Sequence, residues 1–509
     1  MGAMVDRSRA GRFFNTIGVV TVMAGTALLG TGVADASSLL ASTSASTELY
    51  VSAHGATGGA CSKSHPCKSV DRAVVVANGV PYNDTPVTIN VGKGSFVTHL
   101  NFPDKPYPEP KLTITGISAS ATTLTASGSG SVLVAFADAP QITVERLTVS
   151  GATGTSDGSG GAVHDGGNVM NFDDVTFSHN KSIVTPDSGG AIFDDGGTMT
   201  ITDSTFIDNT VGSTQGGGGA VAEQGGTLSI TGSLFSGNTV ESAGSGGALY
   251  VNDGHLSVAN STITANSVTG TATGGAIGLD QAAHTTVKGT TINANSASGS
   301  GGLVSGLAGS KISFGGDVLI GNLGAGGSVC SGGGDSDLGY NVIDQATCSM
   351  GGKTKVESAT AVGLLPLASN GGPTRTERIK KSSAAHSVVP TSFKVAGASF
   401  CSGQDQRGVP RRQGPATKCD SGGYQFGPPV IKGISPDKGT PGTAVTIDGY
   451  GLDFLSLHFG GAAPKFSVSG DVKISTAVPS IAKGEVTITL SNRDGQATTK
   501  FDVLPPPKK

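Results

Sequence analysis

The sequence has no tryptophan and few residues of several other kinds. Only 5% of the 509 residues are aromatic and 14% are charged. Sugar-binding clefts usually present exposed aromatic rings as platforms, so this scarcity argues against a glycan-processing role. Stretches rich in Leu, Glu and Lys with helical periodicity are almost absent, whereas there are 81 glycines and abundant Thr, Ser and Val. This composition predicts an all-β chain.

Positive charge is also in short supply. The formal net charge is −4, with 33 Lys and Arg against 37 Asp and Glu. A nucleic-acid-binding protein needs a basic face to displace counterions from phosphate. We therefore expect no nucleic-acid partner.

Long apolar runs are absent after the N-terminal region. The one such run, residues 17–32, follows three basic residues and precedes Ala34-Asp35-Ala36, the small-x-small pattern that a signal peptidase accepts. A membrane-spanning helix is the alternative, but the run is short and interrupted by glycine. We predict a signal peptide cleaved after Ala36, a secreted or cell-surface protein, and no transmembrane segment after cleavage.

The six cysteines contain no CxxC pair and no Cys/His quartet typical of a metal site. They form three sets of near neighbours: Cys61 with Cys67, Cys330 with Cys348, and Cys401 with Cys419. In an exported chain this even count and spacing predict three local disulfides. A metal centre of unknown identity is the alternative.

A repeat of 28 or 29 residues occupies the middle of the chain. A Gly-Gly-Ala-aliphatic motif begins at positions 160, 189, 218, 246 and 274, and a degenerate copy begins at position 301. A second motif keeps the same register, with Phe or Ile three positions before Asn. Its members are Phe177 and Asn180, Phe206 and Asn209, Phe235 and Asn238, Ile263 and Asn266, and Ile292 and Asn295.

Each repeat holds three short β-like pieces separated by Gly-rich or Asn/Asp turns, and one repeat cannot bury its apolar face alone. Coiled into rungs about 4.8 Å apart, the pieces pair with their copies above and below. We predict a right-handed parallel β-helix with about 28–29 residues per coil. The three phenylalanines should stack inside it, and the five asparagines should form a ladder of amide hydrogen bonds.

A short helix is expected at the start of this solenoid. Val70, Ala73, Val74 and Ala77 follow the i, i+3, i+4, i+7 spacing of an amphipathic helix. Such a helix would cap the open end of the core, where strand edges are otherwise unpaired.

Three stretches resemble known families. The Gly-Gly-Ala and Phe-x-x-Asn motifs resemble the repeat of the polymorphic outer-membrane proteins, which implies a β-helix fold and surface exposure. Leu367 to Thr374, Asp405 to Arg411 and Cys419 to Tyr424 resemble the choice-of-anchor Q domain of secreted bacterial proteins. Pro429 to Gly449, with Phe459-Gly460-Gly461 and Phe501-x-Val503, is similar to an IPT/TIG domain, a small immunoglobulin-like sandwich.

The predicted organisation has five parts. They are a signal peptide (1–36), a Ser/Thr-rich linker (37–47), the β-helix (48–350, with regular repeats over 160–304), a choice-of-anchor Q-like cap (351–427) and an IPT/TIG immunoglobulin-like domain (428–509).

Acidic residues recur shortly after each repeated Gly-Gly. They are Asp165, Asp194, Asp195, Glu223, Asp253 and Asp280. Their register predicts one edge of the solenoid, where stacked carboxylates would repel, raise one another's pKa or bind a cation such as Ca²⁺. Turn chemistry is the alternative, because Asp accepts backbone hydrogen bonds and Gly supplies positive φ. Catalysis by paired carboxylates, as in a glycoside hydrolase, is a third interpretation.

Basic residues offer little for catalysis. Lyase chemistry needs a base, usually Arg or Lys, beside clustered carboxylates, but apart from histidine the only basic residues in 151–304 are Lys181 and Lys288, in different turns. A cluster of Arg407, Arg411, Arg412 and Lys418 is expected to pair locally with Asp405 and Asp420.

We therefore predict a non-catalytic binding, adhesion or structural protein whose partner is a glycan or protein at a cell surface. No catalytic residue is assigned, and no cofactor is expected unless Ca²⁺ binds the acidic turns. One alternative is a polysaccharide hydrolase or lyase with a pectin lyase-like fold. The other is a passive spacer that holds the C-terminal module away from the surface.

Overall fold

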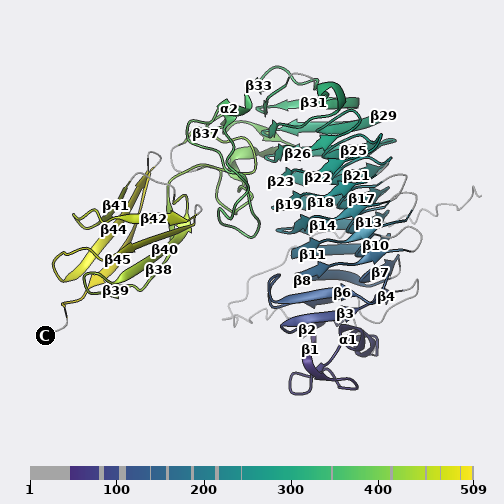
Figure 1. The fold of residues 1–509 in the computed structure, drawn as a ribbon, viewed down its shortest axis with the longest axis horizontal. Helices are drawn as coiled ribbons and strands as arrows, with labels where there is room; N and C mark the ends of the chain where they lie inside the picture. The colour runs from purple at the N-terminus through teal and green to yellow at the C-terminus, as the bar shows by residue number, and fades with distance from the viewer. Residues whose placement is uncertain are drawn as a thin grey trace, which may run out of the picture. The chain divides into compact units, whose positions relative to one another are not determined.

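The computed structural model describes residues 46–79, 85–102, 111–137, 139–155, 160–184, 188–212, 217–241, 243–345, 348–412, 416–452, 456–469, 472–492 and 495–506. They form a long parallel β-solenoid, a segment that packs against it and a β-sandwich (Figure 1). The predicted signal peptide and most of the predicted linker lie outside the described residues. Within those described ranges, no helix is long and apolar enough to cross a membrane.

Three columns of short parallel strands form the solenoid and make up one 27-stranded sheet. The first column contains β4 (Leu100–Phe102), β7 (Leu133–Phe136), β10 (Val163–Gly166), β13 (Ile192–Asp195), β17 (Val221–Gln224), β21 (Leu249–Asn252), β25 (Ile277–Asp280) and the beginnings of β29 (Val304–Gly315) and β31 (Cys330–Gly339). The second contains β1 (Thr47–Ala56), β2 (Val87–Val91), β5 (Lys111–Thr115), β8 (Gln141–Ser150), β11 (Val169–Ser178), β14 (Thr198–Thr202), β18 (Thr227–Thr231), β22 (His255–Ala259) and β26 (His284–Lys288).

The third column and a separate six-stranded sheet complete each coil. The third column contains β3 (Gly94–Thr98), β6 (Thr122–Ala126), β15 (Thr205–Ile207), β19 (Leu234–Ser236), β23 (Thr262–Thr264), β27 (Thr291–Asn293), β30 (Val318–Ile320), β32 (Val342–Ile343) and β33 (Lys355–Val356). The small sheet contains β9 (Thr153–Gly154), β12 (Lys181–Ser182), β16 (Thr210–Val211), β20 (Thr239–Val240), β24 (Ser267–Val268) and β28 (Ser296–Ala297).

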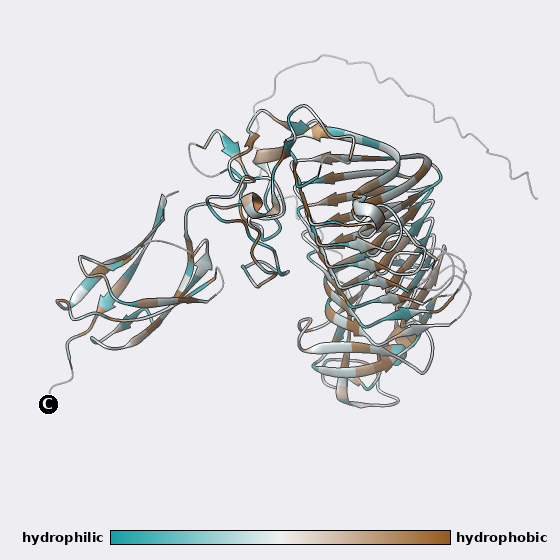
Figure 2. Cartoon of the chain, turned by 45° about the horizontal axis from the view of Figure 1, so that its top comes forward, coloured by the Kyte–Doolittle hydropathy of each residue, from teal (hydrophilic) through white to brown (hydrophobic). Residues whose placement is uncertain are grey.

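Neighbouring rungs pair in parallel with a fixed offset. Ile192 of β13 lies beside Val163 of β10 and Val221 of β17, and all three side chains are buried. Because side chains alternate between the two faces of a strand, every second residue points into the core. Hydrophobic and hydrophilic segments accordingly alternate along these strands (Figure 2). The structure confirms a right-handed parallel β-helix with 28–29 residues per regular coil.

Three phenylalanines stack in the core of the regular coils. The ring centroids of Phe177 and Phe206 are 4.8 Å apart with a 14° angle between the rings. Those of Phe206 and Phe235 are 4.6 Å apart at 5°. One aromatic ring per rung stacks well because the rung spacing of about 4.8 Å is close to a ring-stacking distance.

Buried asparagines form a ladder along one corner. Each side-chain Nδ2 donates to the Oδ1 of the next asparagine, at 2.8–3.0 Å. The members are Asn180, Asn209, Asn238, Asn266, Asn295 and also Asn322, which the sequence motif did not include. Every Oδ1 after the first also accepts the backbone N–H of the preceding asparagine. The amides thus satisfy both their own polar atoms and those of the turn.

A second polar ladder, missed in the sequence analysis, stands where the second column turns into the third. The N–H of Ser204 donates to Ser233 Oγ, and the N–H of Ser233 donates to Ser261 Oγ, both at 3.1 Å. Asp317 continues the ladder by accepting the N–H of Thr290 at 2.7 Å. The sequence did contain a signal for this ladder, since its small polar residues recur at the period of the repeat.

The Gly-Gly-Ala motif lies where coils approach closely. A Cβ on Gly190 would stand 2.0 Å from the carbonyl oxygen of Gly219. Steric space in the next coil, and not backbone conformation, therefore requires glycine at this position.

The predicted capping helix and disulfides are present. Helix α1 (Val70–Ala77) buries the four predicted residues, and Ser69 caps it by accepting the N–H of Arg72 at 3.2 Å. The three disulfides join Cys61 to Cys67, Cys330 to Cys348, and Cys401 to Cys419.

Residues 351–427 are here called the flanking module: β33 within them is the last strand of the third column, and the residues after it pack against that column. The elements are α2 (Ala359–Val362), the strand pair β34 (Val389–Pro390) and β37 (Lys418–Cys419), the pair β35 (Lys394–Val395) and β36 (Ala398–Ser399), and a 3₁₀ turn η2 (Phe400–Ser402), while η1 (Ala325–Gly327) lies in the solenoid. Val318, Ile320 and Val342 of the solenoid share an apolar cluster with Val389 and Phe400. The module thus buries the outer face of the last rungs of this column.

The C-terminal residues form an immunoglobulin-like sandwich of two four-stranded sheets. One contains β38 (Val430–Ser435), β40 (Ala444–Tyr450), β43 (Lys473–Ala477) and β42 (Phe466–Ser469). The other contains β39 (Lys438–Gly439), β45 (Gly495–Val503), β44 (Gly484–Asn492) and β41 (Ser456–Phe459). Ile447, Ile488 and Phe501 belong to its buried core.

Candidate functional site

The predicted acidic residues lie where the first column turns into the second. Strand β13 ends at Asp195, the turn contains Gly196 and Gly197, and β14 begins at Thr198. Gly196 has φ +91°, a conformation that glycine adopts readily. The Gly-Gly after the acidic residues is therefore a tight turn between two parallel columns.

Strand alternation divides these residues into two rows, where the sequence analysis expected a single edge. Ile192 points inward, so Asp194 also points inward and Asp195 points outward. The inner row contains Asp165, Asp194 and Glu223, followed in the next rungs by Val251 and Leu279. The outer row contains Asp195, Gln224, Asn252 and Asp280. Asp253 lies in its turn, with φ +52°.

The inner carboxylates are completely buried and each caps its own turn. The N–H of Asn168 donates to Asp165 Oδ1 at 2.9 Å, and the N–H of Gly197 donates to Asp194 Oδ1 at 3.0 Å. Gly226 makes the same bond to Glu223. The three side chains have 0% exposed surface. One oxygen of each carboxyl group therefore serves the turn.

Burial changes the protonation of the inner row. Loss of hydration raises the pKa of Asp165 to about 7, with a further contribution from the negative charge of Asp194. Burial also raises the pKa of Asp194 and, together with that neighbouring charge, the pKa of Glu223. The second oxygens of the three inner carboxyl groups, Asp165 Oδ2, Asp194 Oδ2 and Glu223 Oε2, are buried and have no hydrogen-bond partner among the described residues. Burial without a partner favours the protonated, uncharged form of a carboxyl group.

A metal site fits this arrangement poorly. Ca²⁺ takes six to eight oxygen ligands, and the inner row offers one side chain per rung facing an apolar core. In the part of the chain that the structure describes, no three His, Cys, Asp or Glu side chains are placed to hold a metal ion.

The outer row does not bring two carboxylates together. Asp195 and Asp280 are three rungs apart, or about 14 Å at the usual strand spacing. Glycoside hydrolases place their two carboxyl groups about 5–9.5 Å apart. Asp280 instead accepts the Tyr250 hydroxyl at 3.2 Å and the N–H of Gln281 at 2.7 Å.

The basic cluster of the flanking module follows the expected local pairing only in part. Arg407 pairs with Asp405 at 2.8 Å, and both are buried. Arg411 donates to the backbone oxygen of Asp420 at 3.2 Å and reaches Asn260 Oδ1 of the solenoid at 2.8 Å. Arg412 and Lys418 are exposed. Arg411 therefore joins the module to the solenoid, a role that sequence spacing could not reveal.

Family models match two parts of the chain. The model of the right-handed β-helix region matches residues 160–343, and the model of the IPT/TIG domain matches residues 429–503. These two regions are thus a right-handed β-helix and an IPT/TIG domain. No curated protein matches it.

Solved structures show distant similarity of fold. A rhamnogalacturonan lyase is 12% identical with a TM-score of 0.31, covering 54% of this chain and 74% of that chain. A pectin methylesterase from carrot is 13% identical with a TM-score of 0.26, covering 61% and 88%. A gamma-CGTase from alkalophilic Bacillus clarkii is 22% identical with a TM-score of 0.15, and this chain spans 18% of its length. Similarities this distant carry no argument about the activity of this chain.

Proposed function

We propose that this chain is a secreted or cell-surface binding protein in which the β-helix is a rigid, non-catalytic scaffold. Its partner is a glycan or protein at a cell surface. The three disulfides support an oxidising, extracytoplasmic location. The IPT/TIG domain fits a surface role.

One observation carries the non-catalytic part of this proposal. Among the six acidic candidates, the three in adjacent rungs of one row point into the core with 0% exposed surface. A substrate cannot reach Asp165, Asp194 or Glu223 without opening the solenoid. Their raised pKa values follow from that burial and need no catalytic explanation.

The test is a glycan and protein array probed with the chain lacking residues 1–36, with reducing-sugar assays on the same glycans. We expect binding to a subset of surface molecules and no new reducing ends above a heat-denatured control. Reducing ends or unsaturated products that increase with protein concentration would overturn the proposal. An array without any bound partner would favour the passive spacer.

A further inference from the structure

The flanking module differs sharply in charge from the solenoid on which it packs. Residues 351–427 contain 11 Lys and Arg against 4 Asp and Glu, whereas residues 48–350 contain 10 against 24. The overall charge of −4 conceals this contrast. A compact basic region in an acidic chain marks a surface suited to an anionic partner.

Three of the four acidic residues of the module, Glu377, Asp405 and Asp420, are buried. Glu377 accepts hydrogen bonds from Thr264 and Asn293 of the solenoid, at 2.8 and 3.1 Å. Asp405 pairs with Arg407, and Asp420 is also buried. The exposed basic residues of the module are Lys353, Lys355, Arg375, Lys380, Lys394, Arg412 and Lys418. The described surface of the module is therefore predominantly cationic.

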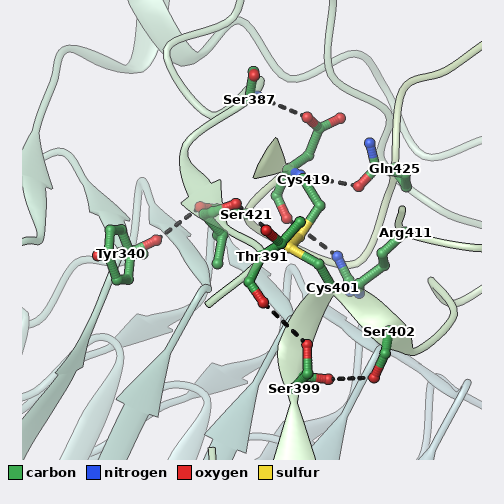
Figure 3. Close-up of a disulfide and its surroundings, with 12 residues drawn as sticks. Tyr340, Ser387, Thr391, Ser399, Cys401, Ser402, Arg411, Cys419, Ser421 and Gln425 are labelled. Atoms are coloured by element: carbon green, nitrogen blue, oxygen red, sulfur yellow. Dashed lines mark hydrogen bonds between the residues drawn. A yellow bond between two sulfur atoms is a disulfide. The ribbon is translucent and has the colours of Figure 1, made fainter. Parts of the chain in front are cut away.

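A hollow of about 390 Å³ opens on this surface. His386, Lys418 and Phe426 are among its lining residues. Lys381 stands beside it, with Nζ 5.9 Å from the centroid of the half-exposed Phe426 ring. Strand β37 carries Lys418 next to Cys419, whose disulfide to Cys401 and pairing with β34 hold this wall in place (Figure 3). Lys418 and Phe426 thus line one concave site, and Lys381 lies near the Phe426 ring.

Asp420 is the one acidic residue among those that line the hollow, and its carboxylate already accepts hydrogen bonds from the protein. The Asp420 carboxylate accepts the N–H groups of Ser387 and Phe426, at 2.7 and 2.6 Å. It also lies 2.9 Å from His386 Nδ1. Hydrogen bonds of this kind disperse a negative charge, so Asp420 opposes an incoming anion only weakly.

The buried cation at the same site keeps its charge. The guanidinium of Arg411 donates to the backbone oxygens of Gln404, Gly289 and Gly422, and to the Asn260 amide oxygen. These acceptors are neutral and orient the guanidinium, while the nearby carboxylates of Asp405, Asp420 and Asp317 partly balance its charge. The exposed Lys418 therefore supplies the accessible positive charge among the lining residues of the hollow.

We propose that this hollow binds an anionic segment of a polysaccharide. Carboxylate or phosphate groups of the polymer lie against Lys381 and Lys418, and a sugar ring packs on Phe426. The inference rests on the proposed binding function and names its ligand class. A glycan fits better than a nucleic acid, because the three disulfides support an extracytoplasmic location.

The test uses the whole chain without residues 1–36 and measures its binding to four immobilised polymers. Polygalacturonate supplies carboxylates, a poly(glycerol phosphate) supplies phosphates, neutral dextran is the uncharged control, and duplex DNA tests simple polyanion binding. We expect binding to at least one acidic glycan and none to dextran. Binding should fall steeply as salt rises to about 0.5 M, since exposed charges are screened.

The double variant Lys381→Glu/Lys418→Glu should weaken acidic-glycan binding by about tenfold or more. Its matched control, Lys63→Glu/Lys311→Glu, makes the same change in net charge at exposed lysines of the solenoid and should stay within about twofold of the original chain. Phe426→Ala should weaken binding to the glycan but not to DNA, since it removes the sugar platform. Thermal melting of each variant separates loss of binding from loss of fold.

The proposal fails if neither acidic glycan binds, if DNA is preferred to both, or if the two double variants lose binding equally. If the array identifies another ligand that the Lys381→Glu/Lys418→Glu variant still binds, this site is refuted while the binding function stands. Glycan turnover would refute the binding function itself.

Discussion

Phe206 lies between two parallel rings and has no exposed surface. Phe206→Ala removes the central ring and leaves a cavity that neighbouring rungs cannot fill. We expect the free energy of unfolding to fall by about 3–5 kcal/mol. Denaturant unfolding measures it, with Thr200→Ala on the outer face of β14 as the control. A loss no larger than that of the control would contradict the stack.

Asn209 joins three rungs, since its Nδ2 donates to Asn238 Oδ1 at 2.9 Å and to Phe177 O at 3.0 Å, while its Oδ1 accepts from Asn180. Asn209→Leu keeps the approximate volume and removes these bonds. Each buried partner left without a hydrogen bond costs about 1–3 kcal/mol. The same change at half-exposed Asn171 is the control in melting experiments. Equal melting temperatures for the two variants would refute the ladder.

The inner carboxylates predict how stability depends on pH. In the unfolded chain an Asp side chain has a pKa near 4, whereas burial raises the pKa of folded Asp165 to about 7. Between these values the folded state binds more protons, so the free energy of unfolding decreases as pH rises from about 4 to about 7. Asp165→Asn should weaken this decrease, because asparagine does not ionise. The measurement is the free energy of unfolding at a series of pH values between about 4 and 7. The same slope against pH for the variant and the original chain would disprove the effect.

At the scale of elements, the flanking module is held on the third column by buried polar contacts. Gln406 Nε2 donates to Thr374 Oγ1 at 2.9 Å and to Ser233 O of the solenoid at 3.3 Å. Gln406→Ala should lower the free energy of unfolding by about 1–3 kcal/mol and speed hydrogen exchange in β37. Gln404→Ala, at an exposed position nearby, is the control. Unchanged exchange in β37 would show that these contacts do not hold the module.

The sequence predicted the strands and the coil period because Phe and Asn recur in register with Gly-Gly-Ala. It could also have separated the acidic rows, since Ile192 inside implies Asp194 inside and Asp195 outside. The packing of the flanking module on the third column was harder to predict from the sequence. Thr262 and Thr264 read as solvent-facing residues of a half-buried strand, yet both are buried under residues that follow more than 100 positions later. Contacts between segments so far apart in the chain produce no periodic pattern in the sequence that would predict them.

At the scale of the whole molecule, composition averages over regions of opposite charge. The near-neutral total argued against a nucleic-acid partner, but it concealed a basic module beside an acidic solenoid. The aromatic ring at the hollow was equally hidden, because Phe426 lies outside the repeats. A rigid acidic scaffold that carries one basic hollow is better suited to holding a ligand than to cleaving one.

The most direct test of this account is mass spectrometry of acidic oligosaccharides of defined length after prolonged incubation with the chain lacking residues 1–36. The account predicts that the oligosaccharides are retained by the protein and recovered with unchanged masses. Shortened or unsaturated products, absent with an Asp194→Asn/Glu223→Gln variant that melts as a folded protein, would contradict it. That result would show that the enclosed carboxyl groups perform catalysis.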